Sequence, residues 1–281
     1  MRLGATHTVS LSEVREEARN CRKLLREKTV EENKVITETP LIVPDGFIVP
    51  QSAENLLSNV CCELLLTAIW QRTSLSLSQF KQLYQRPIER YAELVKKFPA
   101  SESHHAYLGG MLEHGLEIMA YALKFRRSYL LPIGVSSEER SASEIIWTAG
   151  IAYAALIHDI GKLAVDIHVE YQDGLIWHPW HGPLKAAYRF KYRKNREYRL
   201  HIASTGLLYR QIIDSKLLDW LSNCSELWSL FTYFVAGQME LLGVVGELVT
   251  KADQASVLHL LGGNFDAAKS APRHSLQRKL L

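Results

Sequence analysis

The chain has 281 residues, of which 47% are hydrophobic and 22% are charged, and this balance excludes a mainly disordered protein. Its length allows one large globular domain with a substantial core. A formal net charge of +3 is too small to identify nucleic acid as a partner, so the distribution of basic residues has to decide that question.

Neither a disulfide framework nor a membrane segment is indicated. The four cysteines, Cys21, Cys61, Cys62 and Cys224, lack CxxC spacing and are expected to be reduced thiols, most of them in the core. The first residues lack the apolar core of a signal peptide, and no apolar stretch approaches the length of a membrane span. We therefore expect a cytoplasmic protein without membrane insertion.

The amino-terminal segment contains an amphipathic pattern. Ser10 to Glu13 has the spacing of a capping box, and apolar residues recur at helical intervals over 11–25. We assign residues 1–40 to this helix and its connection. Prolines 40, 44 and 50 then surround Asp45-Gly46, which favours a turn-rich connection with a small β-hairpin near residues 41–50.

From residue 53 onward the apolar spacing is mostly helical. Helices are expected over 53–70, 78–98 with a break near Pro87, 107–125, 143–160, 202–221 and 227–260. Strand-like alternation is confined to 188–193, which is short enough to be a strand, a loop or one helical turn. We predict an all-α fold with a catalytic domain over 41–265 and a basic tail or linker over 266–281.

The most informative motif is His158-Asp159-Ile160-Gly161-Lys162, at the end of an apolar helix. A neutral imidazole beside a carboxylate can turn toward one cation, and Gly161 would let the chain leave the helix without a clash. Lys162 could then offer a positive charge to a phosphate oxygen. Asp159 and Lys162 are therefore the candidate catalytic residues.

Histidines cluster around this motif. Eight of the eleven fall between residues 104 and 201, for which a solvated surface offers no physical reason. A single histidine on an apolar helix face is more often a hydrogen-bonded core residue than a ligand, so each is weighed separately. The candidate metal ligands are His114, His158, Asp159, Asp253, His181 and His201, with His104 and His105 as additional metal or phosphate ligands. His7, His259 and His274 are interpreted as structural or surface residues.

Residues 185–199 form a basic segment with interleaved aromatics. They include seven basic residues, one acid and four aromatics, a composition typical of a track in which phosphates meet cations and bases stack on rings. The alternative is a solvated basic helix whose aromatics belong to the core. The candidate nucleic-acid-binding residues are Arg189, Lys191, Arg193, Lys194, Arg196 and Arg199.

The order His114, His158-Asp159, Asp253 resembles the H…HD…D signature of the HD superfamily of metal-dependent phosphohydrolases. That resemblance implies a helical bundle in which these residues hold one metal and extra histidines hold a second. More narrowly, residues 99–117, the His-Asp-Ile-Gly-Lys motif and residues 173–184 are similar to MOBH-type conjugative relaxases, which are TraI-like proteins long labelled as helicases. The similarity extends from about residue 41 to about residue 256.

The resemblance implies a phosphodiesterase that nicks DNA for conjugative transfer of a plasmid or integrative element. Its partners would be single-stranded or origin-of-transfer DNA and the conjugation machinery. Its cofactor would be one or two divalent metal ions, with Mn, Fe, Co, Ni and Zn all compatible with histidine and aspartate ligands. The chain has no Walker A motif, which argues against an ATP-driven helicase. It is also shorter than such relaxases, which usually carry a C-terminal DNA-binding region.

Two other functions stay open at this stage. Related HD exoribonucleases share a similar His-His-Ala-Tyr block, so an HD nucleotidase or 3'-5' exoribonuclease is one alternative. A catalytically silent DNA-binding module with a structural metal is the other. The nucleophile also stays open between metal-bound hydroxide, a histidine and a tyrosine. Tyr107 is the tyrosine to test, although a packing role is favoured for it.

Overall fold

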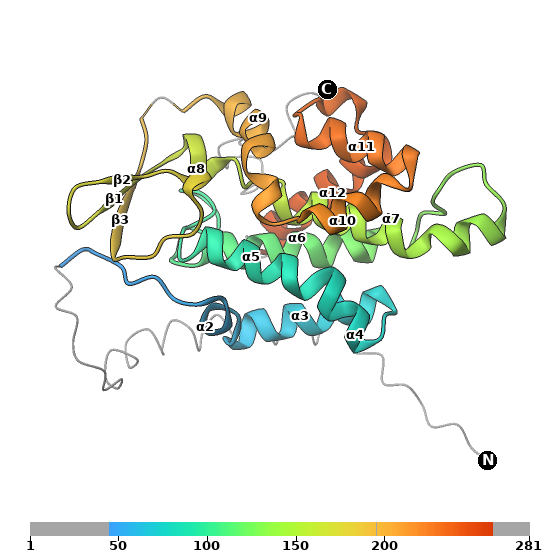
Figure 1. Cartoon of the computed structure of the whole chain (residues 1–281), viewed down its shortest axis with the longest axis horizontal. Helices are drawn as coiled ribbons and strands as arrows, with labels where there is room; N and C mark the ends of the chain where they lie inside the picture. Colours follow the sequence, from blue (N-terminus) through green and yellow to red (C-terminus); the bar gives the residue numbers. More distant parts are fainter. Residues whose placement is uncertain (1–44, 195, 261–281) are drawn as a thin grey trace, which may run out of the picture.

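A computed structural model of the chain describes residues 45–194 and 196–260 (Figure 1). The helix expected within residues 1–40, including the Ser10 capping box, and the tail expected over 266–281 lie outside the described residues, as do residues 41–44. Within the described part, no helix combines the length and the apolar character that crossing a membrane requires.

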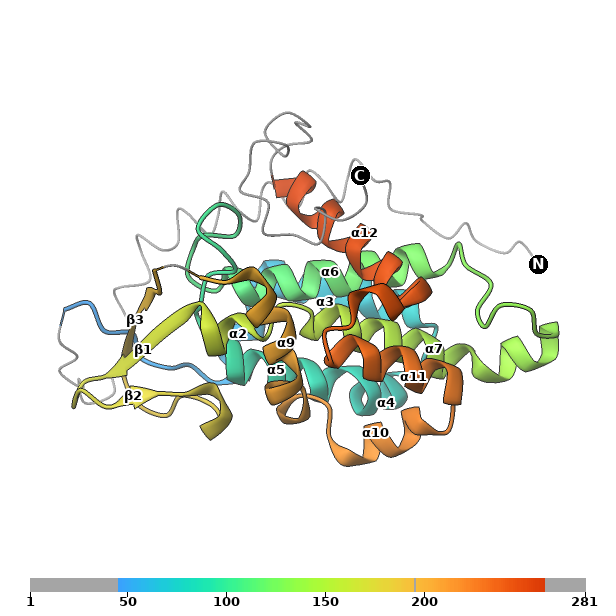
Figure 2. The ribbon, with the colours of Figure 1, turned by 90° about the horizontal axis from the view of Figure 1, so that it is seen from above.

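The body of the molecule is a helical bundle around α6 (Gly110–Arg126). This helix packs against α3 (Val60–Thr73), α7 (Ser137–Ile157) and α12 (Gly243–Leu260), with α5 (Arg86–Val95) also in contact (Figures 1 and 2). Because α6 has neighbours on several sides, nearly all of its side chains are buried, including charged ones. Polar residues on α6 therefore lie in the interior, where they need partners.

Shorter elements complete the bundle. The remaining α-helices are α2 (Ala53–Leu57), α4 (Leu77–Phe80), α8 (Lys162–Val165), α9 (Tyr198–Leu208), α10 (Ser215–Ser222) and α11 (Ser225–Val235). The π-helix η2 (Lys81–Gln85) joins α4 to α5, and 3-10 turns lie at η3 (Pro179–His181), η4 (Tyr209–Gln211) and η5 (Met239–Leu241).

A small antiparallel sheet lies at one end of the bundle, beside α8 (Figure 1). It contains β1 (Ile167–Tyr171), β2 (Ile176–Trp177) and β3 (Tyr188–Tyr192) in the order β2-β1-β3. Val169 of the central strand faces Trp177 on one side and Phe190 on the other. The prediction of an all-α fold with a small β element is confirmed.

The position of the β element differs from the hairpin expected near 41–50. In the described part of that segment, Asp45-Gly46 forms a turn and Ile48 makes a single bridge to Tyr188, with hydrogen bonds of 2.7 and 3.0 Å. The described part of the segment thus adds to β3, while residues 41–44 of the expected hairpin lie outside the described residues. Pro50 lies two residues after Ile48, and because proline lacks an N–H it limits further pairing.

Helix boundaries depart from the apolar pattern where local caps intervene. The helix expected over 53–70 is interrupted because the Asn59 side chain accepts a 2.9 Å bond from the Cys62 N–H and starts α3. α7 begins at Ser137, earlier than expected, because Ser136 and Glu139 form a capping box. Pro87 lies in the first turn of α5, directly after the π-helical turn, where a missing N–H is tolerated.

The burial of α7 determines where the His-Asp motif lies. Its first half is largely exposed, whereas residues 147–157 are all buried against the bundle. Figure 2 shows α7 running from the edge of the molecule toward its centre. At Gly150 a Cβ would lie 2.8 Å from the Leu227 side chain, so α11 approaches α7 closely at that point. The helix ends at Ile157, inside the protein, and His158 follows directly as its C-cap.

Candidate metal centre

Four side chains from three separate helical regions converge in the interior. The His114 Nε2 atom, from α6, lies 3.5 Å from Asp253 Oδ1 on α12 and 3.7 Å from Asp159 Oδ2 at the end of α7. His158 Nε2 lies 3.3 Å from the same Asp159 oxygen. His114, Asp159 and Asp253 are all buried, and His158 is nearly so. The structure thus brings together the four residues of the H…HD…D pattern.

Hydrogen bonds orient both imidazoles toward this point. The Ser256 hydroxyl donates to Glu117 Oε2 at 2.6 Å, so its oxygen accepts from the His114 Nδ1–H at 3.0 Å. The His158 Nδ1 lies 2.9 Å from the Ala155 carbonyl, which can only accept, so this nitrogen also carries a proton. When either ring is neutral, its Nε2 atom therefore carries the lone pair.

Both Nε2 atoms are buried without a hydrogen-bond partner among the described residues. Such orphaned acceptors are costly in a native interior, because buried polar atoms are nearly always satisfied. A divalent cation would satisfy them together with the carboxylates of Asp159 and Asp253. His114, His158 and Asp159 also have donor atoms within 4.8 Å of one another. The residues present therefore fit a metal ion with nitrogen and oxygen ligands.

The electrostatics suit cation binding. Burial lowers the pKa of His114 well below its ordinary value, and the neighbouring histidines lower it further, so the imidazole is neutral near pH 7. For Asp159 burial acts upward, but the charges of His158 and Lys162 outweigh it and hold the pKa of the carboxyl well below its usual range. Burial raises the pKa of Asp253, with His158 opposing and Asp159 reinforcing that shift.

Lys162 is attached to this cluster from α8. Its Nζ donates to Asp159 Oδ2 at 2.5 Å and to the Ala100 carbonyl at 3.2 Å, and the residue is buried. The ammonium group therefore lies beside the candidate metal ligand, where it could stabilise a negative charge that develops on a phosphate.

His104 and His105 reach the cluster from the loop between α5 and α6. Their ring centroids lie 5.1 and 4.8 Å from that of His114, and the three donors form a second group within 4.8 Å. The Ser101 hydroxyl shapes the loop by accepting the His104 N–H at 2.8 Å. At Gly110 a Cβ would lie 2.0 Å from the His105 carbonyl oxygen, so this crossing requires glycine. Burial, with Lys162 next, lowers the pKa of His104 to about 3.

The two remaining candidate ligands do not join these groups. His201 is buried on α9 with its Nδ1 3.8 Å from Asp166 Oδ2, and His181 is exposed on η3 beside His178 and Trp180. Within residues 45–194 and 196–260, the groups of clustered donors contain neither residue. The geometry thus separates His181 and His201 from the other candidate ligands.

The role expected for Gly161 also needs correction. Its φ is −62°, which any residue adopts, so conformational freedom is not what the chain needs there. A Cβ at this position would instead lie 1.8 Å from the His201 carbonyl oxygen. Gly161 is required because α9 crosses directly over the His-Asp motif.

In the basic segment, the cations and the aromatics separate onto two faces. Residues 188–192 form β3, in which Tyr188 is fully buried and Phe190 packs edge-on against Phe98 at 5.3 Å. Lys191 is exposed on the opposite face. Tyr188 is therefore not available to stack on bases. The aromatic residues of the strand pack against the core, as the alternative to a base-stacking track expected.

The six candidate basic residues are mostly at the surface. Arg189 pairs with Glu170 at 3.0 Å, and Arg196 pairs with Glu102 while its guanidinium lies 4.7 Å from the centre of the Tyr192 ring. Lys191, Arg193, Lys194 and Arg199 are exposed, and the Arg193 Nε donates to the Ile167 carbonyl at 3.2 Å. This end of the molecule therefore presents several cations to solvent.

Three functional candidates were missed in the sequence. Glu113 and Glu117 flank His114 on α6, and Ser256 lies three residues after Asp253 on α12. All three are buried. Glu117 and Ser256 each lie one helical turn from a candidate ligand, and this spacing is a usable signal because residues three and four apart share a helix face. Glu113 is adjacent to His114 in the chain and has no such signal.

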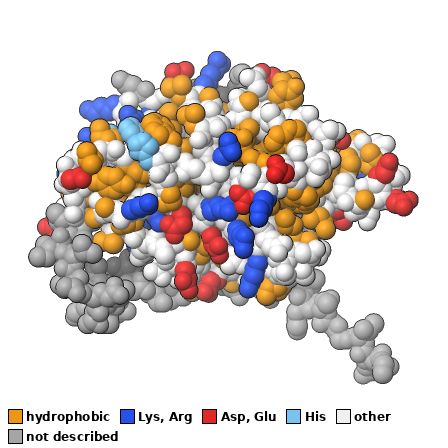
Figure 3. Space-filling view, viewed as in Figure 1, with side chains coloured by type: hydrophobic (Ala, Val, Ile, Leu, Met, Phe, Trp, Pro, Cys, Tyr) orange, Lys and Arg blue, Asp and Glu red, His pale blue; other side chains and the backbone are white. Residues whose placement is uncertain are grey.

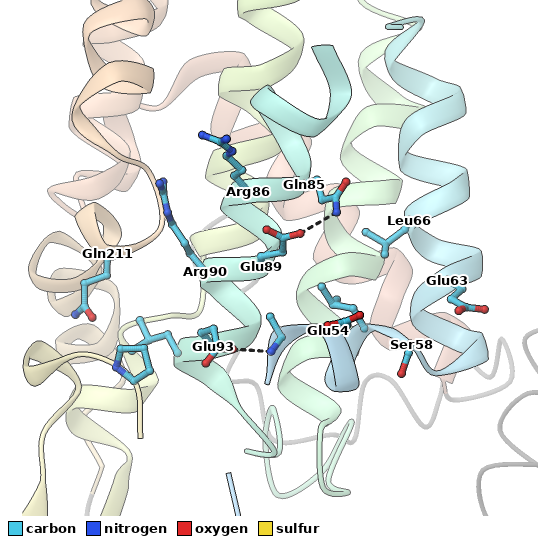
Figure 4. Close-up of a pocket in the computed structure, with 14 residues that line it drawn as sticks. Glu54, Ser58, Glu63, Leu66, Gln85, Arg86, Glu89, Arg90, Glu93 and Gln211 are labelled. Carbon is cyan, nitrogen blue, oxygen red and sulfur yellow. Dashed lines mark hydrogen bonds between the residues drawn. The ribbon is translucent and has the colours of Figure 1, made fainter. Parts of the chain in front are cut away.

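A separate cavity of ≈ 960 Å³ lies among α2, α3 and α5 (Figure 4). None of its lining residues belongs to the histidine groups. Three of its charged groups have local partners, since Glu93 accepts the Ala53 N–H at 2.5 Å, Gln85 donates to Glu89 at 2.8 Å, and Arg90 pairs with Asp214 at 2.9 Å. Figure 3 shows acidic and basic side chains interspersed on this face. The cavity lacks the donor set of the metal centre.

A family model described as "Putative helicase", for TraI-like proteins, matches residues 46–281. The chain belongs to this TraI-like family. A comparison with curated proteins finds no match. Membership links the chain to conjugation and to an enzymatic, relaxase- or helicase-like role. The matched region of this TraI-like protein contains every residue of the metal centre described above.

Proposed function

We propose that this TraI-like protein is a metal-dependent phosphodiesterase of the HD superfamily, acting as the relaxase domain that nicks DNA for conjugative transfer. The observation that carries the proposal is the convergence of His114, His158, Asp159 and Asp253 around a point where two imidazole Nε2 atoms are buried without partners. Such a protein would act in the cytoplasm, on single-stranded or origin-of-transfer DNA.

These four residues would hold a divalent cation. When bound, the ion would supply a hydroxide near neutral pH and neutralise charge on the scissile phosphate. The protein's own contribution is orientation, because the hydrogen bonds at both Nδ1 atoms aim the Nε2 lone pairs inward. Lys162 holds Asp159 and provides a fixed positive charge beside the reacting phosphate.

The exposed basic residues around β3 support a polymeric substrate. Lys191, Lys194 and Arg199 are exposed at the end of the molecule that carries the sheet, and α8 connects this end to the His-Asp motif. Phosphate groups along a strand would be attracted to such residues whatever the base sequence. A mononucleotide would make little use of them, which disfavours a nucleotidase.

The decisive experiment compares substrates with the metal-reconstituted protein. Supercoiled plasmid carrying a cognate transfer origin, linear single-stranded DNA, RNA with a free 3' end and mononucleotides would each be incubated with Mn²⁺, Fe²⁺, Co²⁺, Ni²⁺ or Zn²⁺. We expect nicked plasmid or cut single-stranded DNA, lost in Asp159→Ala with DNA binding retained. Stepwise shortening of RNA would instead indicate an exoribonuclease. Binding without cleavage under every metal would indicate a silent module.

A further inference from the structure

An exposed aromatic cluster lies on the turn η3, close behind strand β2. Trp180 is 49% exposed, although tryptophan is highly buried on average. Its ring stacks on that of His178, with 4.6 Å between the centroids and 8° between the planes. The His181 ring is nearly perpendicular to both, at 6.2 Å from Trp180 and 5.9 Å from His178. We call these three rings the aromatic platform.

The platform keeps an open surface. His178 covers one face of the Trp180 ring, and about half of the Trp180 side chain is still accessible to solvent. The apolar side chains of Leu175 and Ile176, which precede the turn, are also exposed. Packing inside the protein therefore does not explain why these apolar and aromatic groups gather here, whereas an external ligand with a flat apolar face would.

The turn that carries Trp180 is fixed on both sides. The Trp177 indole is buried and its Nε1–H donates to the Gly182 carbonyl at 3.0 Å. The Gln211 side chain donates to the carbonyl of the buried Pro179 at 2.7 Å. Gly182 has a φ of 90°, a conformation that favours glycine, so the chain turns sharply after the platform. Because the turn is already ordered, a ligand pays little to order it further.

The sheet connects the platform to exposed cations. Val169 pairs with Trp177 on one side and Phe190 on the other, and these side chains form the packed face. Because successive side chains alternate, Ile176 and Lys191 lie on the opposite face, and both are exposed. The edge strands β2 and β3 are about 10 Å apart, since neighbouring strands are about 4.8 Å apart. One extended ligand can therefore reach both.

An unpaired strand of nucleic acid has the chemistry that this surface fits. Its bases present flat faces that stack on aromatic rings, and its phosphates are attracted to cations. In the β3 segment, Tyr188 is buried and Phe190 packs against Phe98, so those rings cannot supply the stacking. The exposed Trp180 can. A second exposed cation, Arg210, directly precedes Gln211, which holds the turn.

We propose that Trp180, stacked on His178, binds an unpaired base of single-stranded DNA, with phosphates of the same strand at Lys191 and Arg210. The substrate class rests on the proposed function, and the inference adds a base-stacking subsite outside the set of metal ligands. Duplex DNA would not use this subsite, because its bases are stacked on one another. The subsite would accept any base, since every base has a π face.

The test measures binding of a labelled thymidine oligonucleotide to the full chain by fluorescence anisotropy, with a chelator present to prevent cleavage. Trp180→Ala should weaken binding by about 5- to 150-fold, the range typical of one stacked base. Trp180→Phe keeps an aromatic face and should retain most of the affinity. Leu130→Ala is the matched control, because Leu130 is an exposed apolar residue between α6 and α7, and it should bind like the wild type. Circular dichroism and thermal melting check that each variant is folded.

Two further measurements distinguish stacking from charge. An oligonucleotide with abasic positions should bind the wild type and Trp180→Ala equally weakly, because the base that Trp180 contacts is missing. The dependence of log K on log salt should be the same in Trp180→Ala and the wild type, because no phosphate contact is lost. A change in that slope, or an equal loss of affinity on the abasic strand, would overturn stacking as the role of Trp180.

The outcomes also separate this inference from the proposed function. Normal binding by Trp180→Ala together with cleavage by the wild type would overturn the platform and leave the function intact. Binding that depends on Trp180, without cleavage under any metal, would support the platform and overturn the phosphodiesterase. An RNA strand of the same length that binds more tightly, with the same dependence on Trp180, would overturn DNA as the ligand. No single-strand binding by the wild type would overturn both proposals.

Discussion

His114 Nε2 and Asp253 Oδ1 lie 3.5 Å apart, although one residue is on the central helix α6 and the other is on α12, the last helix of the described chain. This contact exists because α12 packs against α6 (Figure 2). It brings Asp253 to the candidate metal centre.

Replacing Asp253 should therefore remove metal binding without unfolding the protein. Asp253→Asn keeps the size of the side chain but removes its charge, and we expect metal affinity to fall at least about 100-fold, since changes outside the ligand set alone cost about 10- to 100-fold. Titration with Mn²⁺ would measure this change. Asp219→Asn, at an exposed position on α10, is the control and should bind normally. Equal affinities for the two variants would refute the role of Asp253.

Ser256 should act as a positioning residue for His114. In Ser256→Ala the His114 Nδ1–H loses its acceptor and the ring can rotate or change tautomer, so metal affinity should decrease by about tenfold or more. The direct readout is the tautomer of His114, observed by nitrogen NMR of the metal-free protein. Ser229→Ala, at an exposed position on α11, should change neither quantity. An unchanged tautomer in Ser256→Ala would contradict the assignment.

The metal-free protein should lose stability as pH falls below about 6.5. Burial lowers the pKa of His104 to about 3 and that of His114 well below its ordinary value, so the unfolded chain takes up protons that the folded chain does not. This stability is present above the unfolded pKa and is lost as pH falls toward the folded values. The pKa of His158 is raised, because the charge of Asp159 outweighs its burial, and this histidine acts in the opposite sense. Because two histidines have a lowered pKa and only one has a raised pKa, we expect a net loss of stability on acidification.

Thermal unfolding in the presence of a chelator, between pH 7.5 and 5.5, would test this dependence. The midpoint should fall over that range, with each differentially bound proton contributing at most about 1.4 kcal/mol per pH unit to the free energy of unfolding. His104→Asn should reduce the slope, whereas His178→Asn, which changes a histidine outside the clustered groups, should not. A midpoint that rises on acidification would show that these histidines are protonated in the folded state.

Replacing Lys162 should lower the rate of DNA cleavage without weakening metal binding. Lys162→Met keeps the length of the side chain but removes the charge beside Asp159. We expect metal affinity to be maintained or increased, because a repulsive cation is lost, while the cleavage rate falls by about 10² or more. The rate of plasmid nicking at saturating metal is the measurement. A variant with unchanged cleavage would exclude Lys162 from the reaction.

Exposed cations near β3 should contribute to DNA affinity without sequence preference. A Lys191→Ala/Lys194→Ala variant should bind single-stranded DNA more weakly, and each lost phosphate contact should reduce the dependence of log K on log salt by about 0.7. Fluorescence anisotropy over a series of salt concentrations measures both effects. Lys216→Ala, exposed on α10, is the control. Identical salt slopes for the double variant and the wild type would place the DNA elsewhere.

Much of the architecture could be predicted from local patterns. Helical periodicity indicated an all-α bundle because apolar residues repeat with the period of a helix whichever neighbour later covers them. The His-Asp motif was conspicuous because its residues are adjacent in the chain. The pattern does not decide the short strand at 188–192, since five residues cannot distinguish a strand from a turn without knowing that Ile167–Tyr171 lies beside them.

Other features could not be obtained from one sequence. Cap residues such as Asn59 and Ser136 moved helix ends by several positions, and single hydrogen bonds of this kind are weak signals among many serines and asparagines. The clustering of histidines along the chain also predicts more metal ligands than the structure brings together. His181 and His201 are close to the motif in sequence, yet one lies on the surface and the other pairs with Asp166.

The sequence by itself determined which chemistry the chain carries, because the order of histidines and aspartates and the helical spacing around them are local properties. Only the tertiary structure decided which of those side chains meet. The packing of α12 on α6 brings Asp253 to His114, and the loop over Gly110 brings His105 to Glu113 and Glu117. Contacts between distant segments depend on how whole helices pack, and helical periodicity does not specify which helices will be neighbours.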